Sequence, residues 1–192
     1  GELELEGFGG LFSAAIYTDH MNSDANIIYL SQGGLSLPDE SYYREEQYQE
    51  IRDAFILHVA KMFHLAGFSD GSEHAARILS LETQIANNHW DQVRDRDATL
   101  TYNKFTFAEL ATLSPVFDCQ VWLEAGEIPH STFDTQVVRE PDFFTGVGVL
   151  LANFDTNIRS SWLISHVLRV HPPYLTHHLV AHSHAFSTNT PS

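Results

Sequence analysis

The segment from Tyr29 to Tyr43 constrains the fold of this chain more than any other part of the sequence. It contains an apolar stretch, a glycine pair at Gly33 and Gly34, a proline at Pro38 and a final tyrosine pair, in that order. Glycine adopts turn conformations that other residues avoid, and proline ends or restarts a regular element. We therefore expect a strand to end near Gly33 and a helix to begin after Pro38.

The residues before the glycine pair have the pattern of a β-hairpin. Apolar side chains cluster at 11–12, 14–17 and 27–30, and a polar stretch over 18–26 separates the clusters. Short apolar runs bounded by turn residues are typical of paired strands. We expect a hairpin over about residues 11–37.

The residues after Pro38 have a helical pattern instead. Apolar side chains recur there at steps of three and four, which places them on one face of a helix. They are Tyr48, Ile51, Phe55, Val59, Met62 and Phe63. We expect one amphipathic helix from about Ser41 to Ala66, ended by Gly67, because a glycine in the left-handed conformation commonly follows the last turn of a helix.

Two later helices are predicted by capping boxes, in which a polar residue and a glutamate three positions later each bond to the other's backbone amide. The first pair is Asp70 and Glu73. The second is Thr106 and Glu109, whose helix ends at Pro115.

The rest of the chain is mainly helical as well. We expect a short helix around 121–123, a strand at 136–139, a helix over 142–151 after Pro141, and a long helix over 158–170 capped by Asp155. The sequence therefore predicts a mainly α fold, a multi-helix domain with a small β-hairpin near the N-terminus. Residues 1–192 are expected to form this one domain, with helices over about 41–186.

The charge balance argues against two classes of partner. The formal net charge is −15 at pH 7. Such a charge repels a phosphate backbone and an anionic membrane surface, so we expect no nucleic-acid partner. No apolar run approaches the roughly 20 residues that span a bilayer, and we expect no membrane segment in this chain.

The cysteine count and the first residues bear on location. Cys119 is the only cysteine, so no internal disulfide can form. Gly1–Glu6 is acidic where a signal peptide carries basic charge. We expect a cytoplasmic location, where thiols stay reduced.

The C-terminal histidines are the densest set of potential metal ligands. His178 and His182 are spaced i and i+4, which places both on one helix face, and His177 and His184 are close in sequence. Leu179 stands where a metalloprotease motif has its general-base glutamate. We favour ordinary surface histidines, and a metal site at His178, His182 and His184 is the alternative.

A charged stretch has the outline of a calcium loop. Asp95, Asp97 and Thr99 occupy alternate positions, but Leu100 stands where such a loop needs glycine. A solvated helix end with local ion pairs is the favoured interpretation.

The remaining patterns also favour structural roles. The glycines of the segment 146–149 lack the third glycine of a nucleotide loop and are expected to let two helices approach closely. Adjacent carboxylates at 39–40 and 45–46 do not face each other on a helix, and we expect them on a solvated face. Cys119 is expected to be buried or inert. We assign no catalytic residue and no cofactor site to this chain.

Several of these segments resemble the neprilysin-like zinc metalloendopeptidases. The family's segment Q-G-G-L-G-L-P-x-x-x-Y-Y is similar to Gln32–Tyr43, with Ser36 in place of a glycine. Three further family patterns, A-x-x-I-x-x-L-E-x-x-I-A, Y-N-K-M-T-x-x-E-L and V-V-x-x-P-x-Y/F, are similar to the segments Arg77–Ala86, Tyr102–Leu110 and Val137–Phe143. The resemblance covers about Phe12 to His182.

The resemblance implies a parent enzyme of two lobes, one of which carries zinc and cleaves peptides. This chain would be most of the other lobe, which caps the active-site cavity and restricts it to short peptides. Its partners would be the missing catalytic lobe of the same polypeptide and, in the parent, the peptide substrate. No histidine in these 192 residues precedes a glutamate, so the family's HExxH pair is absent. We expect the chain alone to bind no zinc and to have no peptidase activity.

The resemblance fails after Tyr174 and Leu175. The family continues there toward its catalytic half, whereas this chain reads Ala185–Ser192 and ends. A fragment of a longer enzyme and the product of a shifted or degenerate gene both fit this ending. The alternative of another class is a free-standing helical binding or scaffold domain without peptidase function.

Overall fold

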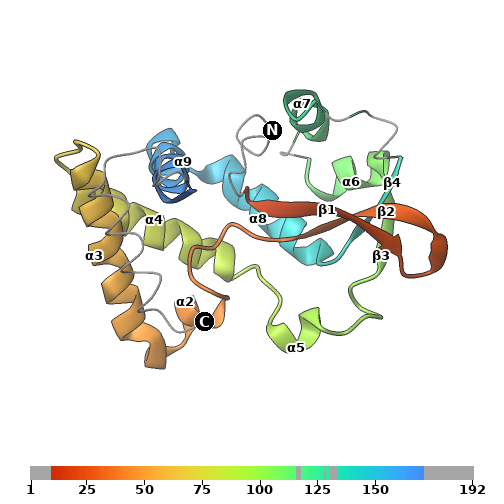
Figure 1. Cartoon of the computed structure of the whole chain (residues 1–192), viewed down its shortest axis with the longest axis horizontal. Helices are drawn as coiled ribbons and strands as arrows, with labels where there is room; N and C mark the ends of the chain where they lie inside the picture. The colour runs from red at the N-terminus through yellow and green to blue at the C-terminus, as the bar shows by residue number, and fades with distance from the viewer. Residues whose placement is uncertain (1–9, 116–117, 128, 130–133, 171–192) are drawn as a thin grey trace. The chain divides into compact units, whose positions relative to one another are not determined.

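The computed structural model describes residues 10–115, 118–127, 129 and 134–170 (Figure 1). The chain divides into two compact units, unit 1 with residues 1–34 and 88–153, and unit 2 with residues 35–87 and 154–192. The mainly helical fold with a hairpin near its start is confirmed. That residues 1–192 form a single domain stays a prediction. No helix in the described ranges is long and apolar enough to cross a bilayer.

Unit 1 is built around a mixed sheet. β1 (Phe12–Asp19) and β2 (Asn22–Gln32) form the predicted antiparallel hairpin. β4 (Thr135–Val138) lies parallel to β2, and β3 (Asn103–Thr106) pairs antiparallel with β4. The strand order is β1-β2-β4-β3, so β1 and β3 are the edges of the described sheet.

The turn of the hairpin is shorter than the predicted stretch 18–26. Thr18 is already the partner of Asn26, and β2 begins at Asn22. The Asp19 carboxylate accepts a 2.9 Å hydrogen bond from the Met21 amide and so helps to form the tight turn. The start of β2 is polar and largely exposed, which gives a strand the composition of a turn.

The sequence analysis predicted the strand at 136–139, which is confirmed as β4, but it missed β3. β3 has only four residues, and its partner residues lie far along the chain, since Asn103 pairs with Val138. Strand propensity depends strongly on the neighbouring strands. A local pattern therefore does not reveal so short a strand.

Four helices accompany the sheet in unit 1. They are α5 (Gln92–Asp95), α6 (Phe107–Leu113), α7 (Cys119–Ala125) and α8 (Pro141–Asn153). The capping box of α6 is confirmed, because the Thr106 hydroxyl accepts from the Glu109 amide at 3.3 Å and the Glu109 carboxylate accepts from the Thr106 amide at 2.8 Å. Pro141 is the first residue of α8, where its fixed φ suits the helix and its missing N–H is not needed.

Unit 2 is helical. It contains α2 (Ser41–Arg44), the 3₁₀ turn η1 (Glu46–Tyr48), α3 (Gln49–Leu65), α4 (Gly71–Ala86) and α9 (Thr156–Val170). α3 packs against α4, and α9 contacts both. The Asp155 carboxylate caps α9 as predicted, accepting from the Asn157 amide at 2.9 Å. The core of this unit includes Phe55, Val59, Phe63, Ile78, Ile85 and Trp162.

The prediction of one continuous helix over 41–66 was wrong. The helix breaks at Glu45, whose φ of −90° and ψ of 138° are extended. The Arg52 guanidinium donates to the carbonyls of Tyr42 at 2.6 Å and Glu45 at 2.9 Å. Carbonyls released by the break thus gain a charged donor from the next helix. The spacing of apolar residues in the sequence carries no information about such a side-chain bond.

Of the two predictions for the connection between α3 and α4, one is confirmed and one is not. Gly67 follows α3 with φ +94°, as predicted. The capping box predicted at Asp70 and Glu73 was wrong, since the Asp70 side chain caps no amide. Both carboxylates are used one turn along α4 instead: Asp70 lies 3.3 Å from His74, and Glu73 lies 3.0 Å from Arg77.

Candidate functional site

We first consider metal-ligating side chains among the described residues. No group of three or more His, Cys, Asp or Glu side chains that could hold a metal ion occurs among them. His177, His178, His182 and His184 lie outside the described residues, so the alternative metal site stays a prediction.

The aspartates of the calcium-loop pattern bond to other protein groups. The Asp97 carboxylate accepts from the amide and hydroxyl of Thr99 at 2.9 and 2.6 Å. These bonds lower the pKa of Asp97. Asp95 accepts instead from the Arg139 guanidinium at 3.0 Å. The predicted helix end with local ion pairs is thus only partly met, because Asp95, the last residue of α5, pairs with a residue 44 positions along the chain.

The glycines of α8 serve close packing. A Cβ atom at Gly146 would lie 1.9 Å from Oδ1 of Asn88, and one at Gly148 would lie 2.2 Å from Oγ of Ser114. The close approach was predicted, but its partners are two polar side chains from loops rather than a second helix.

The most developed polar site of unit 2 surrounds Glu82. Its side chain is fully buried in α4. Glu82 Oε1 accepts from the Ser36 hydroxyl at 2.5 Å, and Oε2 accepts from the Ser36 amide at 3.1 Å and from the Tyr43 hydroxyl at 2.6 Å. The Tyr43 oxygen accepts in turn from the Leu37 amide at 2.9 Å. One carboxylate therefore fixes both ends of the segment 36–43.

Burial sets the electrostatics of this site. It raises the pKa of Glu82, while the positive charge of Arg169 and the hydrogen bonds from Ser36 and Tyr43 oppose the rise. Burial and the neighbouring carboxylate also raise the pKa of Tyr43, so its hydroxyl keeps its proton and donates it. A buried carboxylate is tolerated only when its oxygens are hydrogen-bonded, and here both are.

A matching site in unit 1 surrounds Gln32. Its side-chain amide exchanges two hydrogen bonds with the backbone of Trp90, Nε2 donating to the carbonyl at 3.1 Å and Oε1 accepting from the amide at 2.8 Å. The Gln32 amide donates to Oε2 of Glu140 at 2.7 Å. His89 lies 2.8 Å from the Gly33 carbonyl. The end of β2 is thus bonded to the segment 89–90 and to the residue before α8.

Glu140 is the buried acid of unit 1. Its side chain has no solvent exposure. Burial, together with a hydrogen bond to the Asp95 carboxyl group, raises the pKa of Glu140 to about 8, although the Gln32 amide and Arg139 oppose the rise. Arg139 lies 3.3 Å from Oε1. Burial therefore favours the protonated form of Glu140 more than water does, against the pull of its two cationic and amide neighbours.

These two sites explain how the segment that most constrains the fold is held in place. Gln32–Gly34 belongs to unit 1 and is held by Trp90 and Glu140, whereas residues 35–43 belong to unit 2 and are held by Glu82. Gly34 has φ +83°, a conformation that glycine adopts without strain. The Gln32–Tyr43 segment is therefore a structural connector with a buried acid on each side.

The sequence analysis missed both buried acids. It placed Glu40 on a solvated face, yet Glu40 is buried. A signal for Glu82 was present, because it stands four residues after Ile78 and three before Ile85, within the apolar stripe of α4. A carboxylate at a core position of a helix predicts a buried hydrogen-bonded site.

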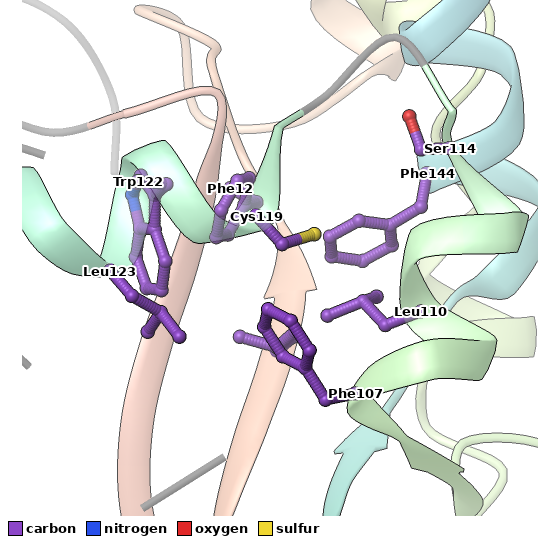
Figure 2. A pocket seen from close by; sticks show the side chains of 9 residues that line it. Phe12, Phe107, Leu110, Ser114, Cys119, Trp122, Leu123 and Phe144 are labelled. Carbon is purple, nitrogen blue, oxygen red and sulfur yellow. The ribbon is translucent and has the colours of Figure 1, made fainter. Parts of the chain in front are cut away.

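Unit 1 also contains an apolar pocket (Figure 2). The Phe12 ring centroid lies 5.3 Å from that of Trp122 and 5.4 Å from that of Phe144. The other lining residues come from β2, α6, the end of α6, and α7; they are Leu30, Phe107, Leu110, Ser114, Cys119 and Leu123. Apart from the Cys119 thiol, this lining has no titratable group, so it offers apolar contact rather than acid–base chemistry.

Cys119 lies in the wall of this pocket, with its sulfur directed toward the Phe144 ring (Figure 2). The residue is buried, and burial raises the pKa of its thiol. Since the thiolate is the nucleophile, a raised pKa makes the group unreactive. The prediction of a buried or inert cysteine is confirmed in its burial.

Comparison with known proteins gives consistent relatives. The sequence model of the N-terminal region of peptidase family M13 matches residues 1–192. Endothelin-converting enzyme 1 of Cavia porcellus is 29% identical over 166 residues, which cover 82% of this chain and 22% of that protein. The human enzyme is 28% identical, with 82% of this chain and 21% of that protein covered. The chain thus spans about a fifth of the length of these relatives.

The solved structures agree. The zinc metalloprotease Zmp1 of Mycobacterium tuberculosis in its open state superposes with a TM-score of 0.94 at 36% identity, over 98% of this chain and 30% of that one. PepO from Lactobacillus rhamnosis shares the fold, with a TM-score of 0.75 at 16% identity over 96% of this chain and 30% of that one. The sequence model matches the full length of the chain, and the superposition on Zmp1 agrees with it. The chain therefore belongs to peptidase family M13, as part of the family's N-terminal domain.

Proposed function

We propose that this chain is the non-catalytic N-terminal part of a zinc metalloendopeptidase, in which it caps the active-site cavity and restricts it to short peptides. The observation that carries the proposal is the match of the family's N-terminal sequence model to all of residues 1–192. The superposition on a zinc metalloprotease at 36% identity supports it.

The chemistry of the chain supports a role without catalysis. The sequence has no HExxH pair. The described residues offer no set of three metal-ligating side chains, so they do not fit a zinc ion. Zinc, which would polarise the scissile carbonyl and activate water, belongs to the catalytic part of the parent in this proposal. The chain by itself then hydrolyses no peptide.

The capping role follows from what a cover does to a peptidase cavity. A lobe that closes over the active site excludes bulk water and any substrate too large to enter. Only peptides short enough to fit beneath the cover are cleaved. The buried acids Glu82 and Glu140 would keep each unit rigid enough for this steric role, since each is hydrogen-bonded to a segment distant in sequence, Glu82 to Ser36 and Glu140 to Gln32.

The gene provides the first test. The DNA downstream of the Ser192 codon is sequenced and translated in all three frames. An in-frame HExxH followed by a third carboxylate ligand supports the proposal, and the same motif in a shifted frame indicates a broken gene. If neither is found, the chain is a free-standing helical domain and the peptidase proposal is abandoned.

Substrate size provides the second test. The complete polypeptide is incubated with a short fluorogenic peptide and with a folded protein that carries the same cleavage sequence in an exposed loop. We expect cleavage of the peptide and negligible cleavage of the folded protein. Equal kcat/KM for both substrates would contradict the cap, while leaving the peptidase assignment intact. The 192-residue chain serves as the inactive control.

A further inference from the structure

The strand β1 forms one edge of the unit 1 sheet in the part of the chain that the structure describes. The residues from Ser13 to Thr18 include no charged residue, no glycine and no proline, and the charged residue of β1 is its last, the buried Asp19. Among the described strands, only β2 pairs with β1. On its other side, every second residue of an antiparallel edge strand directs its N–H and C=O groups outward. Such an edge is a template for another strand.

The opposite edge of the same sheet is protected in the usual ways. β3 is only four residues long and carries Lys104. The Lys104 ammonium lies 3.1 Å from the carboxylate of Asp19, the last residue of β1. Short length and a lysine are recognised means of blocking edge-to-edge pairing. The contrast between the two edges indicates that Ser13–Thr18 of β1, which have no second neighbouring strand in the described sheet, are suited to accept one.

The exposed side chains of β1 show how a partner would approach. Ile16 is 62% exposed and Tyr17 is 63% exposed. Adjacent residues on a strand point to opposite faces of the sheet. A partner that covered one face would leave the other side chain in water, whereas a strand alongside β1 would shield both. Met21, 74% exposed, continues this apolar surface into the turn.

We propose that β1 accepts, as an added strand, an extended segment from the catalytic part of the same polypeptide. The inference rests on the proposed function and names the surface through which the two parts join. The amount of chain outside residues 1–192 favours this occupant, because the chain covers only 30% of the Zmp1 chain on which it superposes. A segment of the same polypeptide also has a high effective concentration at the edge.

Hydrogen exchange tests the proposal directly. Amide exchange in residues 12–18 is measured in the 192-residue chain and in the complete polypeptide encoded by the gene. We expect exchange of alternate β1 amides to slow by about ten-fold or more in the complete polypeptide, because those amides gain hydrogen-bond acceptors. Equal exchange in the two proteins overturns the proposal. Exchange that slows in the short chain with rising concentration assigns the edge to a second copy and also overturns it.

Two variants of the complete polypeptide show whether the strand edge is responsible. Ile16→Lys and Tyr17→Lys place a charge on either face of β1 and should remove the added protection. Val149→Lys is the matched control, because Val149 is 59% exposed on α8 of the same unit. Protection that survives in both β1 variants contradicts the proposal. Loss of protection in the control as well shows a general loss of structure and likewise contradicts it.

The failure of this inference differs from failure of the proposed function. A complete polypeptide that cleaves the short peptide, yet leaves β1 amides unprotected, overturns only the added strand. A gene without a downstream HExxH removes the proposed function, and the catalytic occupant with it.

Discussion

The hydroxyl of Tyr43 donates a 2.6 Å hydrogen bond to Oε2 of Glu82, a carboxylate with no exposure to solvent. The two residues are 39 positions apart, and the bond attaches α2 to the C-terminal half of α4. Because Glu82 also accepts from Ser36, the loss of one donor would leave a buried oxygen only partly satisfied.

The first prediction tests this bond. Tyr43→Phe removes the hydroxyl and should lower the free energy of unfolding by about 1–3 kcal/mol, the usual cost of leaving a buried polar group without its partner. Urea unfolding followed by circular dichroism measures the change. Tyr42→Phe is the control, since it removes a neighbouring hydroxyl that makes no bond to Glu82. Equal losses in both variants would show that the Tyr43–Glu82 bond contributes nothing specific.

The second prediction concerns Glu140 and pH. Folding raises the pKa of Glu140 from 4.5 to about 8, so the folded form binds this proton more tightly than the unfolded form. The contribution of Glu140 to stability is therefore complete below pH 4.5 and is lost as the pH rises toward 8. Glu140→Gln keeps an acceptor for the Gln32 amide and should flatten this decline.

Exchange of the Gln32 amide gives a local measurement of the Glu140 effect, because this amide donates to Glu140. In the native chain, the stability that limits its exchange should fall between pH 5 and pH 8, after correction for the intrinsic pH dependence of exchange. In Glu140→Gln it should change little over that range. The same slope in both proteins would mean that Glu140 does not hold the proton.

The third prediction concerns His166, with the opposite sign. Burial, aided by the charge of Arg169, lowers the pKa of His166 from 6.5 to about 4. The folded form therefore favours the neutral ring, and this contribution is complete above pH 6.5 and lost as the pH falls through 4. His166→Leu should reduce the acid-induced fall in Tm. His64→Leu, at an exposed position of α3, should retain the native pH dependence.

The fourth prediction concerns the packing of α8. Gly146→Ala would gain about 0.5–1 kcal/mol of helix propensity. The new Cβ, however, would lie 1.9 Å from Oδ1 and 2.7 Å from Cγ of Asn88, and such overpacking costs about 1–3 kcal/mol. We expect a net loss of stability in urea unfolding.

A double-mutant cycle identifies the cause of that loss. Asn88→Ala removes the clashing atoms, so the Gly146→Ala penalty should be smaller in its presence, with a coupling energy of about 0.5–3 kcal/mol. Additive effects would mean that the penalty arises elsewhere in the helix. Val149→Ala, at an exposed position of the same helix, serves as the reference substitution.

The fifth prediction concerns the C-terminal histidines. On the favoured interpretation of surface residues, zinc should not shift the Tm of the chain, because one pair of imidazoles is an incomplete zinc site. A shift that disappears in the His178→Ala/His182→Ala double variant would support the metal site instead. Differential scanning fluorimetry with and without zinc measures the effect.

Several features governed by neighbouring residues were readable from the sequence, although the local capping box predicted at Asp70 and Glu73 did not form. The capping box of Thr106 and Glu109, the helix end at Gly67 and the helix start at Pro141 are all observed. Each depends on a few consecutive residues, either through a local hydrogen bond or through the allowed backbone angles of glycine and proline. The resemblance of short segments to a peptidase family was likewise sufficient to identify the family.

Features governed by distant partners were decided by the tertiary structure. The predicted long helix is interrupted at Glu45, where Arg52 bonds a carbonyl that the break releases, and β3 pairs with β4, which lies far along the chain. Glutamate is mostly exposed in proteins, yet Glu82 and Glu140 are each buried against donors from other segments. Burial and hydrogen-bond satisfaction depend on which segments come into contact in the folded chain. Composition and the periodicity of apolar residues do not specify those contacts.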